Sequence, residues 1–318
     1  MKQRAHFPLH FHRHQHGVAV ITALLLTTLA ITIVASLFWQ QQVQVRAIEN
    51  QRLQSQKEWI LRGALDWARL ILRRDAIDSP QTQLGAAWAT PLQKTKLDEF
   101  VENGRTDTEA SEAALQGHIV DAQSLLNLTN LCANGIINPR EVAAFAKLLS
   151  LLNLDPQLAT ASAMLQAQAQ RRPVESPSPD SGVRMMGLTR VEDLLAVPGL
   201  TPAMLVQLRE FVIVLPRATP LNINTASAEV LAAKVAALSL ADAMAAVAAR
   251  KQAFFLSVGD LQHRFPTQLQ GVQGSDLTVN SNFFLVNGDV RMGRAALQVQ
   301  SLVERSGTGA MVLWTHEN

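Results

Sequence analysis

The chain has 318 residues, of which 48% are hydrophobic, so it can bury one large domain or two ordinary ones and is not a disordered chain. Its formal net charge is +2, which excludes a strong overall field for gathering nucleic acid or anionic lipid from a distance. The only cysteine, Cys132, excludes an internal disulfide and argues against a thiolate zinc site.

The first hydrophobic segment runs from Val18 to Trp39 and carries no charged residue. Its roughly 22 residues, at about 1.5 Å each, match the thickness of a bilayer core, which predicts a transmembrane helix. Three basic residues and no acidic residue precede the segment. By the positive-inside rule the first 17 residues stay in the cytoplasm and everything after about residue 40 lies outside.

A cleaved secretory signal is the alternative for this segment, because Val34-Ala35-Ser36 is a weak match to a cleavage site. The apolar run is longer than the roughly 7–15 residues typical of such signals. The sequence after Trp39 also continues in helical style, with no proline and the single glycine Gly63 before about Arg74. Apolar residues recur there at steps of three and four, which predicts one long helix with an amphipathic outer half.

The N-terminus resembles a type IV prepilin or pseudopilin: a short basic leader ends in Gly17, and the apolar segment begins at Val18. The resemblance implies that a prepilin peptidase cuts between Gly17 and Val18 and that the new amine of Val18 is methylated. Most members have Glu at mature position five, where this chain has Thr22. The K-class minor pseudopilins of the type II secretion system are similar in lacking that Glu. An ordinary signal-anchor helix that begins near a glycine is the alternative.

The rest of the chain predicts a small sheet interrupted by helices. Residues 75–117 are polar and irregular, with helical promise only at 91–102. One strand is expected at 117–123, and alternating apolar residues predict an antiparallel meander from three C-terminal strands, at 282–290, 295–303 and 310–314. Between them, Ala- and Leu-rich runs predict helices at about 139–154, 156–171, 189–196, 201–214, 226–236 and 239–252. The proline-rich stretch 171–182 is expected to be an exposed loop.

The expected fold class is therefore α+β: a pilin-like long N-terminal helix packed on a small antiparallel sheet, with a large all-helical domain inserted in the sheet. K-class pseudopilins resemble this plan, and the segment Val286–Ala295 is also similar to theirs. The expected organisation is a leader at 1–17, the membrane and assembly helix at 18–39, the helix extension with the first part of the pilin-like domain at 40–123, the insert at 124–281 and the last strands at 282–318.

Part of the insert resembles helix-hairpin-helix modules, around Val197-Pro198-Gly199-Leu200 and Leu221-Asn222-Ile223-Asn224-Thr225-Ala226. DNA-binding versions hold a phosphate with a Gly-x-Gly hairpin backed by basic residues. Here the second glycine is missing, and basic and acidic residues balance over 188–250. We therefore expect a packing unit and no nucleic acid partner, while a membrane-anchored periplasmic DNA-binding protein is the alternative function.

No cofactor is required by any motif. Asp276 and Asp289 are weak calcium candidates, because carboxylate oxygens suit calcium and the K class resembles calcium proteins, although their spacing matches no calcium loop. Turn formation by Asn and Asp is the alternative reading. No catalytic signature is present, so we expect a protein that is not an enzyme.

The resemblance implies a minor pseudopilin at the tip of the type II secretion pseudopilus, which initiates or caps its assembly for the export of folded proteins. It implies as partners the minor pseudopilins of the I and J classes, the major pseudopilin, the prepilin peptidase and the bacterial inner membrane. The chain would be single-pass, with its N-terminus cytoplasmic and its body periplasmic.

Overall fold

The computed structural model describes residues 16–96, 114–170, 187–266, 276–292, 295–307 and 309–317. The chain divides into two compact units, Met1–Glu58 and Trp59–Asn318. Each unit is described by itself below.

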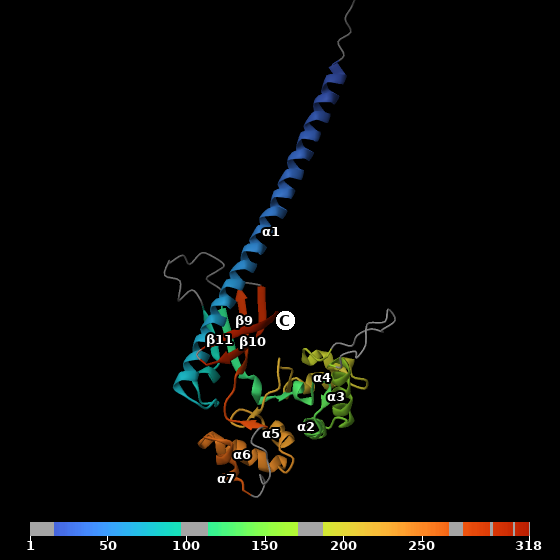
Figure 1. Ribbon diagram of the computed structural model, residues 1–318. Coiled ribbons are helices and arrows are strands. Elements are labelled where there is room, and N and C mark those ends of the chain that lie inside the picture. The colour runs from blue at the N-terminus through green and yellow to red at the C-terminus, as the bar shows by residue number, and fades with distance from the viewer. Residues whose placement is uncertain are drawn as a thin grey trace, which may run out of the picture. The chain divides into compact units, whose positions relative to one another are not determined.

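The longest element is the helix α1, His16–Asp78, whose 63 residues continue one turn beyond the expected end near Arg74 (Figure 1). The helix is uninterrupted because no proline occurs between His16 and Ser79, and the ring of Pro80 cannot continue a helix. At its end the amide of Ser79 donates to the carbonyl of Asp75 at 2.9 Å. From Val18 to Ile48 the side chains of α1 are exposed, whereas in the second unit Ala68, Leu72 and Asp75 are buried.

The second unit contains a five-stranded antiparallel sheet in the order β1-β2-β9-β10-β11. Its strands are β1 (Leu92–Lys96), β2 (Ala114–Asp121), β9 (Phe283–Met292), β10 (Ala295–Ser306) and β11 (Gly309–Glu317). In the register, Leu285 on β9 lies opposite both Val120 on β2 and Leu302 on β10. The expected α+β class and the antiparallel C-terminal meander are confirmed.

The expected helix at 91–102 is wrong over Leu92–Lys96, which forms the edge strand β1. Its partner β2 lies later in the chain, with Thr95 opposite Leu115 and Lys96 opposite Ala114. The pairing partner therefore decides the conformation of a segment whose local pattern favours neither state. Residues 97–102 lie outside the described residues.

The part of α1 that lies in the second unit packs on one face of this sheet. One buried cluster is formed by Leu72 on the helix, Trp88 in the short 3-10 helix η1 (Ala87–Ala89), Phe284 on β9, Val303 on β10 and Ala310 on β11. The rings of Trp88 and Phe284 meet edge to face, with centroids 5.3 Å apart. This cluster fixes the helix to the sheet.

The segment between β2 and β9 carries the helical insert, labelled α2 to α7 in Figure 1. The α-helices are α2 (Pro139–Leu151), α3 (Gln157–Gln170), α4 (Pro202–Leu208), α5 (Ala228–Lys234), α6 (Leu240–Gln252) and α7 (Val258–Arg264). Short 3-10 helices are η4 (Ala122–Ser124), η5 (Leu128–Leu131) and η6 (Val191–Ala196). Two-residue strand pairs join β3 (Leu126–Asn127) to β6 (Val212–Ile213), β4 (Cys132–Ala133) to β5 (Ile136–Ile137) and β7 (Leu221–Asn222) to β8 (Leu277–Thr278).

Most expected helices of the insert are confirmed, with two corrections. The helix expected at 201–214 ends at Leu208, because Val212–Ile213 pairs with β3 as the strand β6. The run at 189–196 is a 3-10 helix rather than an α-helix. The sequence reasoning also missed α7, which is only two turns long and mixed in polarity. The expected loop at 171–182 lies outside the described residues.

Two hydrophobic clusters hold the insert. A large cluster inside it includes the fully buried Phe145, Leu148 and Leu194. A smaller cluster joins it to the sheet: Ile213 and Leu215 of the insert pack with Phe283, Leu285 and Leu302 of the strands. Insert and sheet therefore share apolar contacts as well as the two chain connections at β2 and β9.

Candidate functional site

The first candidate surface is the apolar part of α1. Every side chain from Val18 to Trp39 is exposed, and no charged residue occurs between Val18 and Val45. Within the described residues, α1 is the helix long and apolar enough to cross a membrane. A contiguous apolar surface of this size is unfavourable in water, so it requires a bilayer or apolar protein partners.

The hydroxyl groups in this segment are satisfied within the helix itself. Thr22 Oγ1 donates to the backbone carbonyl of Val18 or Ala19, each 3.0 Å away. Thr27, Thr28 and Thr32 make the same kind of contact with their preceding turns. These threonines therefore need no external partner in a bilayer.

Gly17 and Val18, the expected processing residues, lie in the first turn of α1. Thr22 lies one turn further on and presents no charge to a neighbouring molecule. Cleavage between Gly17 and Val18 and methylation of Val18 stay predictions.

The second candidate surface is the outward face of α1 in the second unit. At about 100° per residue, Trp59, Leu70 and Ile77 fall within about 20° of one another, on the side opposite the buried Ala68 and Leu72. Trp59 is 68% exposed and Trp67, at the edge of this face, is 49% exposed. The sequence analysis missed both tryptophans, although their eight-residue spacing on a helix was a usable signal.

An apolar groove of about 640 Å³ adjoins this face. Its walls are Ala64, Trp67 and Ile71 on α1 and side chains of β2 and β9, among them Ile119 and Val286. Trp67 therefore borders both the groove and the exposed face of α1. The groove and the exposed face of α1 therefore form one apolar surface on the second unit.

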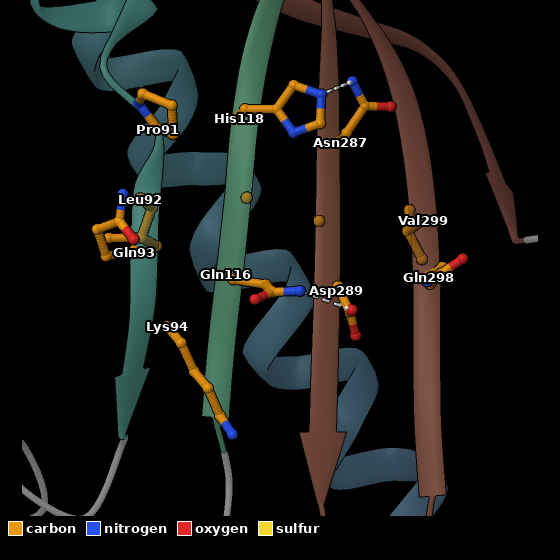
Figure 2. A pocket seen from close by; sticks show the side chains of 12 residues that line it. Pro91, Leu92, Gln93, Lys94, Gln116, His118, Asn287, Asp289, Gln298 and Val299 are labelled. Carbon is orange, nitrogen blue, oxygen red and sulfur yellow. Dashed lines mark hydrogen bonds between the residues drawn. The ribbon is translucent and has the colours of Figure 1, made fainter.

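Away from the insert, the other face of the sheet is polar. Figure 2 shows Gln116 and His118 of β2 beside Asn287 and Asp289 of β9, on the side of the strands away from α1. Gln116 Nε2 donates to Asp289 Oδ2 at 2.9 Å, and Asn287 Nδ2 lies 3.3 Å from His118 Nε2. These side chains pair with one another across the strands, which is the arrangement of a solvated sheet face.

The two calcium candidates lie in different parts of the second unit. Asp276 directly precedes β8, whereas Asp289 lies in β9, where it contacts Gln116 and, at 3.5 Å, Arg291. Within the described residues no group of three or more His, Cys, Asp or Glu side chains could hold a metal ion. Calcium binding stays a prediction, which thermal melting with EDTA or with added calcium would test.

The helix starts of the insert are occupied by its own side chains. At α6, Ser239 Oγ accepts from the amide of Asp242, whose carboxylate accepts from the amide of Ser239. At α7, Asp260 occupies the same role and accepts from the amide of Leu256 at 3.1 Å. A backbone phosphate would meet a carboxylate at both places, which argues against the DNA-binding alternative.

The pKa values of two carboxylates at helix starts follow from these contacts. The amide of Leu256 holds the pKa of Asp260 below its ordinary value, with help from Arg264. Burial acts to raise the pKa of Asp193 at the start of η6, but hydrogen bonds from Thr189 and Arg190 outweigh it and lower the pKa. Both acids are therefore held as anions at neutral pH.

A basic side chain near the α5–α6 hairpin is also turned inward. Lys147 Nζ donates to the carbonyls of Val235, Ala236 and Leu238, at 3.2, 3.0 and 2.8 Å. Burial lowers the pKa of Lys147. The ammonium group of Lys147 therefore holds the connection between α5 and α6 together. In this position it is poorly placed to contact a phosphate of DNA.

Comparison with known proteins identifies a family and several relatives with similar sequences. Two family models match, both described as type II secretion system (T2SS), protein K: one over residues 124–217 and the other over residues 221–287. The chain is 27% identical to type II secretion system protein K of Pseudomonas aeruginosa, covering 93% of this chain and 91% of the relative. It is 26% identical to the protein of that name from Klebsiella pneumoniae, covering 92% and 93%.

A solved structure has the same fold. One chain in the crystal structure of the GspK-GspI-GspJ complex from the enterotoxigenic Escherichia coli type 2 secretion system aligns with a TM-score of 0.63 and 18% identity. The alignment covers 85% of this chain and 98% of that chain.

Together with the family models and the curated relatives, the α+β body and the exposed apolar helix define the class as a pseudopilin of type II secretion. The chain belongs to the type II secretion system protein K family. This is a family of structural proteins and not of enzymes.

Proposed function

We propose that the protein is the tip subunit of a type II secretion pseudopilus, which initiates or caps its assembly for the export of folded proteins. The observation that carries this proposal is the uncharged, exposed segment Val18–Trp39 on a chain of the protein K family. The segment anchors the protein in the bacterial inner membrane as a single span. The N-terminus is cytoplasmic and the body periplasmic, in agreement with the basic residues ahead of the span.

Processing prepares the segment for assembly. A prepilin peptidase cuts between Gly17 and Val18, and the new amine of Val18 is methylated. Thr22 supports a position ahead of all other subunits: its hydroxyl is bound to its own helix and offers no carboxylate to another subunit's terminal amine. Because a tip subunit has no neighbour ahead of it, it loses nothing by lacking that charge.

Lateral partners bind along α1. The homologous structure contains GspI and GspJ beside GspK, so minor pseudopilins of the I and J classes are the proposed partners of this chain. Trp59, Trp67, Leu70 and Ile77 supply an apolar helix face of the kind that large aromatic side chains make favourable in interfaces. The major pseudopilin follows below the minor subunits.

The test of processing uses the full-length chain, expressed with and without a prepilin peptidase. We expect a membrane-bound product that begins at Val18 only when the peptidase is present, read by N-terminal sequencing. A Gly17→Leu variant should keep its leader because a side chain there hinders the close approach of the protease. An intact wild-type leader, or a terminus near Ser36, would contradict the pathway.

Position in the filament needs a separate test. Trp67→Cys in a Cys132→Ala background, labelled with a thiol-attached photo-crosslinker, should cross-link to an I- or J-class partner when all three proteins are co-expressed. Gln298→Cys, on the polar face of the sheet and labelled in the same way, is the matched control and should not cross-link to them. Equal cross-linking at both positions, or the presence of this subunit throughout the shaft, would contradict the tip assignment.

A further inference from the structure

The chain passes between sheet and insert at two places, and a buried polar cluster joins them. The outgoing chain leaves β2 at Asp121, and the returning chain enters β9 after Ser281. Both residues are almost completely buried, as are Thr82, Asn222 and Arg305. These five residues, with Asp75 and Thr225, are named here the junction.

The first centre of the junction is the carboxylate of Asp121. Its Oδ2 accepts from Thr225 Oγ1 and Ser281 Oγ, both at 2.6 Å, and lies 2.9 Å from Asn222 Nδ2. Its Oδ1 accepts from the amide of Gln123 at 2.8 Å. The carboxylate of Asp121 thus binds three segments of the chain: the one that follows β2, the one that precedes β9, and the segment of the insert at β7.

The second centre is the guanidinium of Arg305 on β10. One nitrogen donates to Asp75 Oδ2 at 2.7 Å, which ties it to the end of α1. The other donates to Thr82 Oγ1 at 2.8 Å and to the carbonyl of Ser281 at 2.9 Å. The planar fork of Arg suits this set of diverging acceptors, and its charge is compensated by Asp75.

Thr82 and Ser281 connect the two centres. The amide of Ser281 donates to Thr82 Oγ1 at 3.0 Å, and Asn222 Nδ2 lies 3.1 Å from the carbonyl of Thr82. The end of α1, the sheet and the insert therefore meet in one continuous hydrogen-bonded network. Such a network is stable while every member is paired, and costly once one member is removed.

The segment Leu221–Ala226 provides the residues of the insert that contact the junction. It also allows two neighbouring asparagines to be compared. Asn222 points into the junction, whereas Asn224, two residues on, binds only within the insert: its side chain exchanges hydrogen bonds with both backbone groups of Phe255, at 2.9 and 2.8 Å. Both asparagines are buried. The motif that resembles a helix-hairpin-helix module is thus used to dock the insert.

We propose that the junction is a latch that couples the end of α1 to the helical insert. The latch opens as a unit while the sheet and the core of the insert stay folded. The inference concerns this chain alone and stands whether or not the protein caps a pseudopilus. The physical reason is the contrast in contacts: the sheet and the insert each have their own apolar cluster, while the polar network and one small cluster join them.

The test is amide hydrogen exchange of the full-length chain in detergent micelles, with Asn222→Ala compared with Asn224→Ala. Asn222→Ala should speed exchange about tenfold to hundredfold at Gln123, Ser281 and Asn282, because it leaves buried groups unpaired. Amides of α2 and of the β9–β10 pair should be unchanged. Asn224→Ala should instead speed exchange at Phe255 and leave the junction as in the wild type.

Two results would overturn the latch. One is wild-type exchange at Ser281 and Asn282 in Asn222→Ala. The other is equal acceleration in the junction, α2 and β9, which would mean that the junction melts only with the whole body. If Asn222→Ala fails to fold, Thr225→Val removes one hydroxyl at nearly constant volume and should give the same pattern to a smaller degree, with the same two results counting against the proposal.

Discussion

The apolar segment Val18–Trp39 of α1, called the stem here, and the helical insert are both rich in apolar residues, yet the stem exposes them and the insert buries them. From Val18 to Trp39 every side chain is exposed, whereas the insert buries Phe145, Leu148 and Leu194 completely. The insert also pairs the buried charges of Lys234 and Glu141 and caps the start of α6, as a self-sufficient folding unit must. The stem has no such internal partners, so its stability depends on a bilayer or on other subunits.

The largest expected effect breaks a buried ion pair of the insert. The side chains of Lys234 and Glu141 are 5% and 7% exposed and pair between α5 and α2. Lys234→Met leaves a buried carboxylate without its cation, so we expect a loss of about 3–5 kcal/mol in the free energy of unfolding, measured by denaturant melts. Membrane association of the stem should be unaffected.

The control for that pair replaces both partners. Glu141→Leu with Lys234→Met should lie close to the wild type, since a buried ion pair and a packed apolar pair are similar in stability. A double variant as unstable as the single one would show that the charges matter for another reason.

The converse change places a charge in the stem. Leu25→Arg should cost about 2.5–3.5 kcal/mol of membrane insertion while the melting of the body stays unchanged. The measurement is the fraction of chain that resists alkaline extraction from membranes. Leu25→Ile is the matched control and should stay in the membrane, and full retention of the Arg variant would contradict a spanning role for this segment.

A smaller effect is expected at the start of α6. Ser239→Ala removes the hydroxyl that caps the amide of Asp242 and should lower the stability of the insert by about 1 kcal/mol. Ser239→Thr keeps a hydroxyl and should lose less, as measured by thermal melting. An Ala variant that melts like the wild type would mean that the cap is not formed in solution.

The response to acid should differ between the junction and the helix starts. Burial raises the pKa of Asp121 and of Asp75, against opposing hydrogen bonds from Ser281 and Arg305 respectively. These two acids bind protons more readily when folded, so their contribution favours the fold as pH falls from neutral toward the ordinary value of 3.8. Asp193 and Asp260 have lowered pKa values, so their stabilisation is present above 3.8 and is lost as pH falls below it.

Hydrogen exchange corrected for intrinsic rates can check this difference. Between pH 7 and about 4.5 the amide of Ser281 should become better protected, while amides at the starts of η6 and α7 should not change. Asp121→Asn removes the titrating group and should flatten the response at Ser281. A junction that loosens over this range would contradict the direction of both pKa shifts.

No measurable effect is expected from DNA. The full-length chain in detergent should give no gel shift with duplex DNA at low salt, because Asp242 and Asp260 stand at the helix starts of the insert and Lys147 is turned inward. A salt-sensitive shift that is lost in Lys251→Gln would revive the DNA-binding alternative.

The sequence was most informative where structure is local. A long uncharged run, a following helical period and alternating strands near the C-terminus predict α1, β9, β10 and β11, because each pattern repeats within a few residues. The strand β1 and the end of α4 were misread for the opposite reason: Thr95 pairs with Leu115 and Val212 with Leu126, and neither partner is marked by local spacing.

The candidate functional residues also fall into those that the sequence marks and those that only the fold brings together. Gly17, Val18 and Thr22 stand out by position in the sequence, and the exposure of the stem followed from its composition alone. The groove beside Trp67 required the helix and the sheet to be placed together. Asp121 and Arg305 are separated by most of the chain and resemble any other charged residues until the fold buries them in one network.

The sequence by itself therefore determined the membrane-length stem, the protein K resemblance and the α+β class, because hydrophobic period and length act over neighbouring residues. Only the tertiary structure decided where the insert is held and which polar groups hold it. Those contacts join residues far apart in the chain, and their strength comes from burial, which no local pattern records.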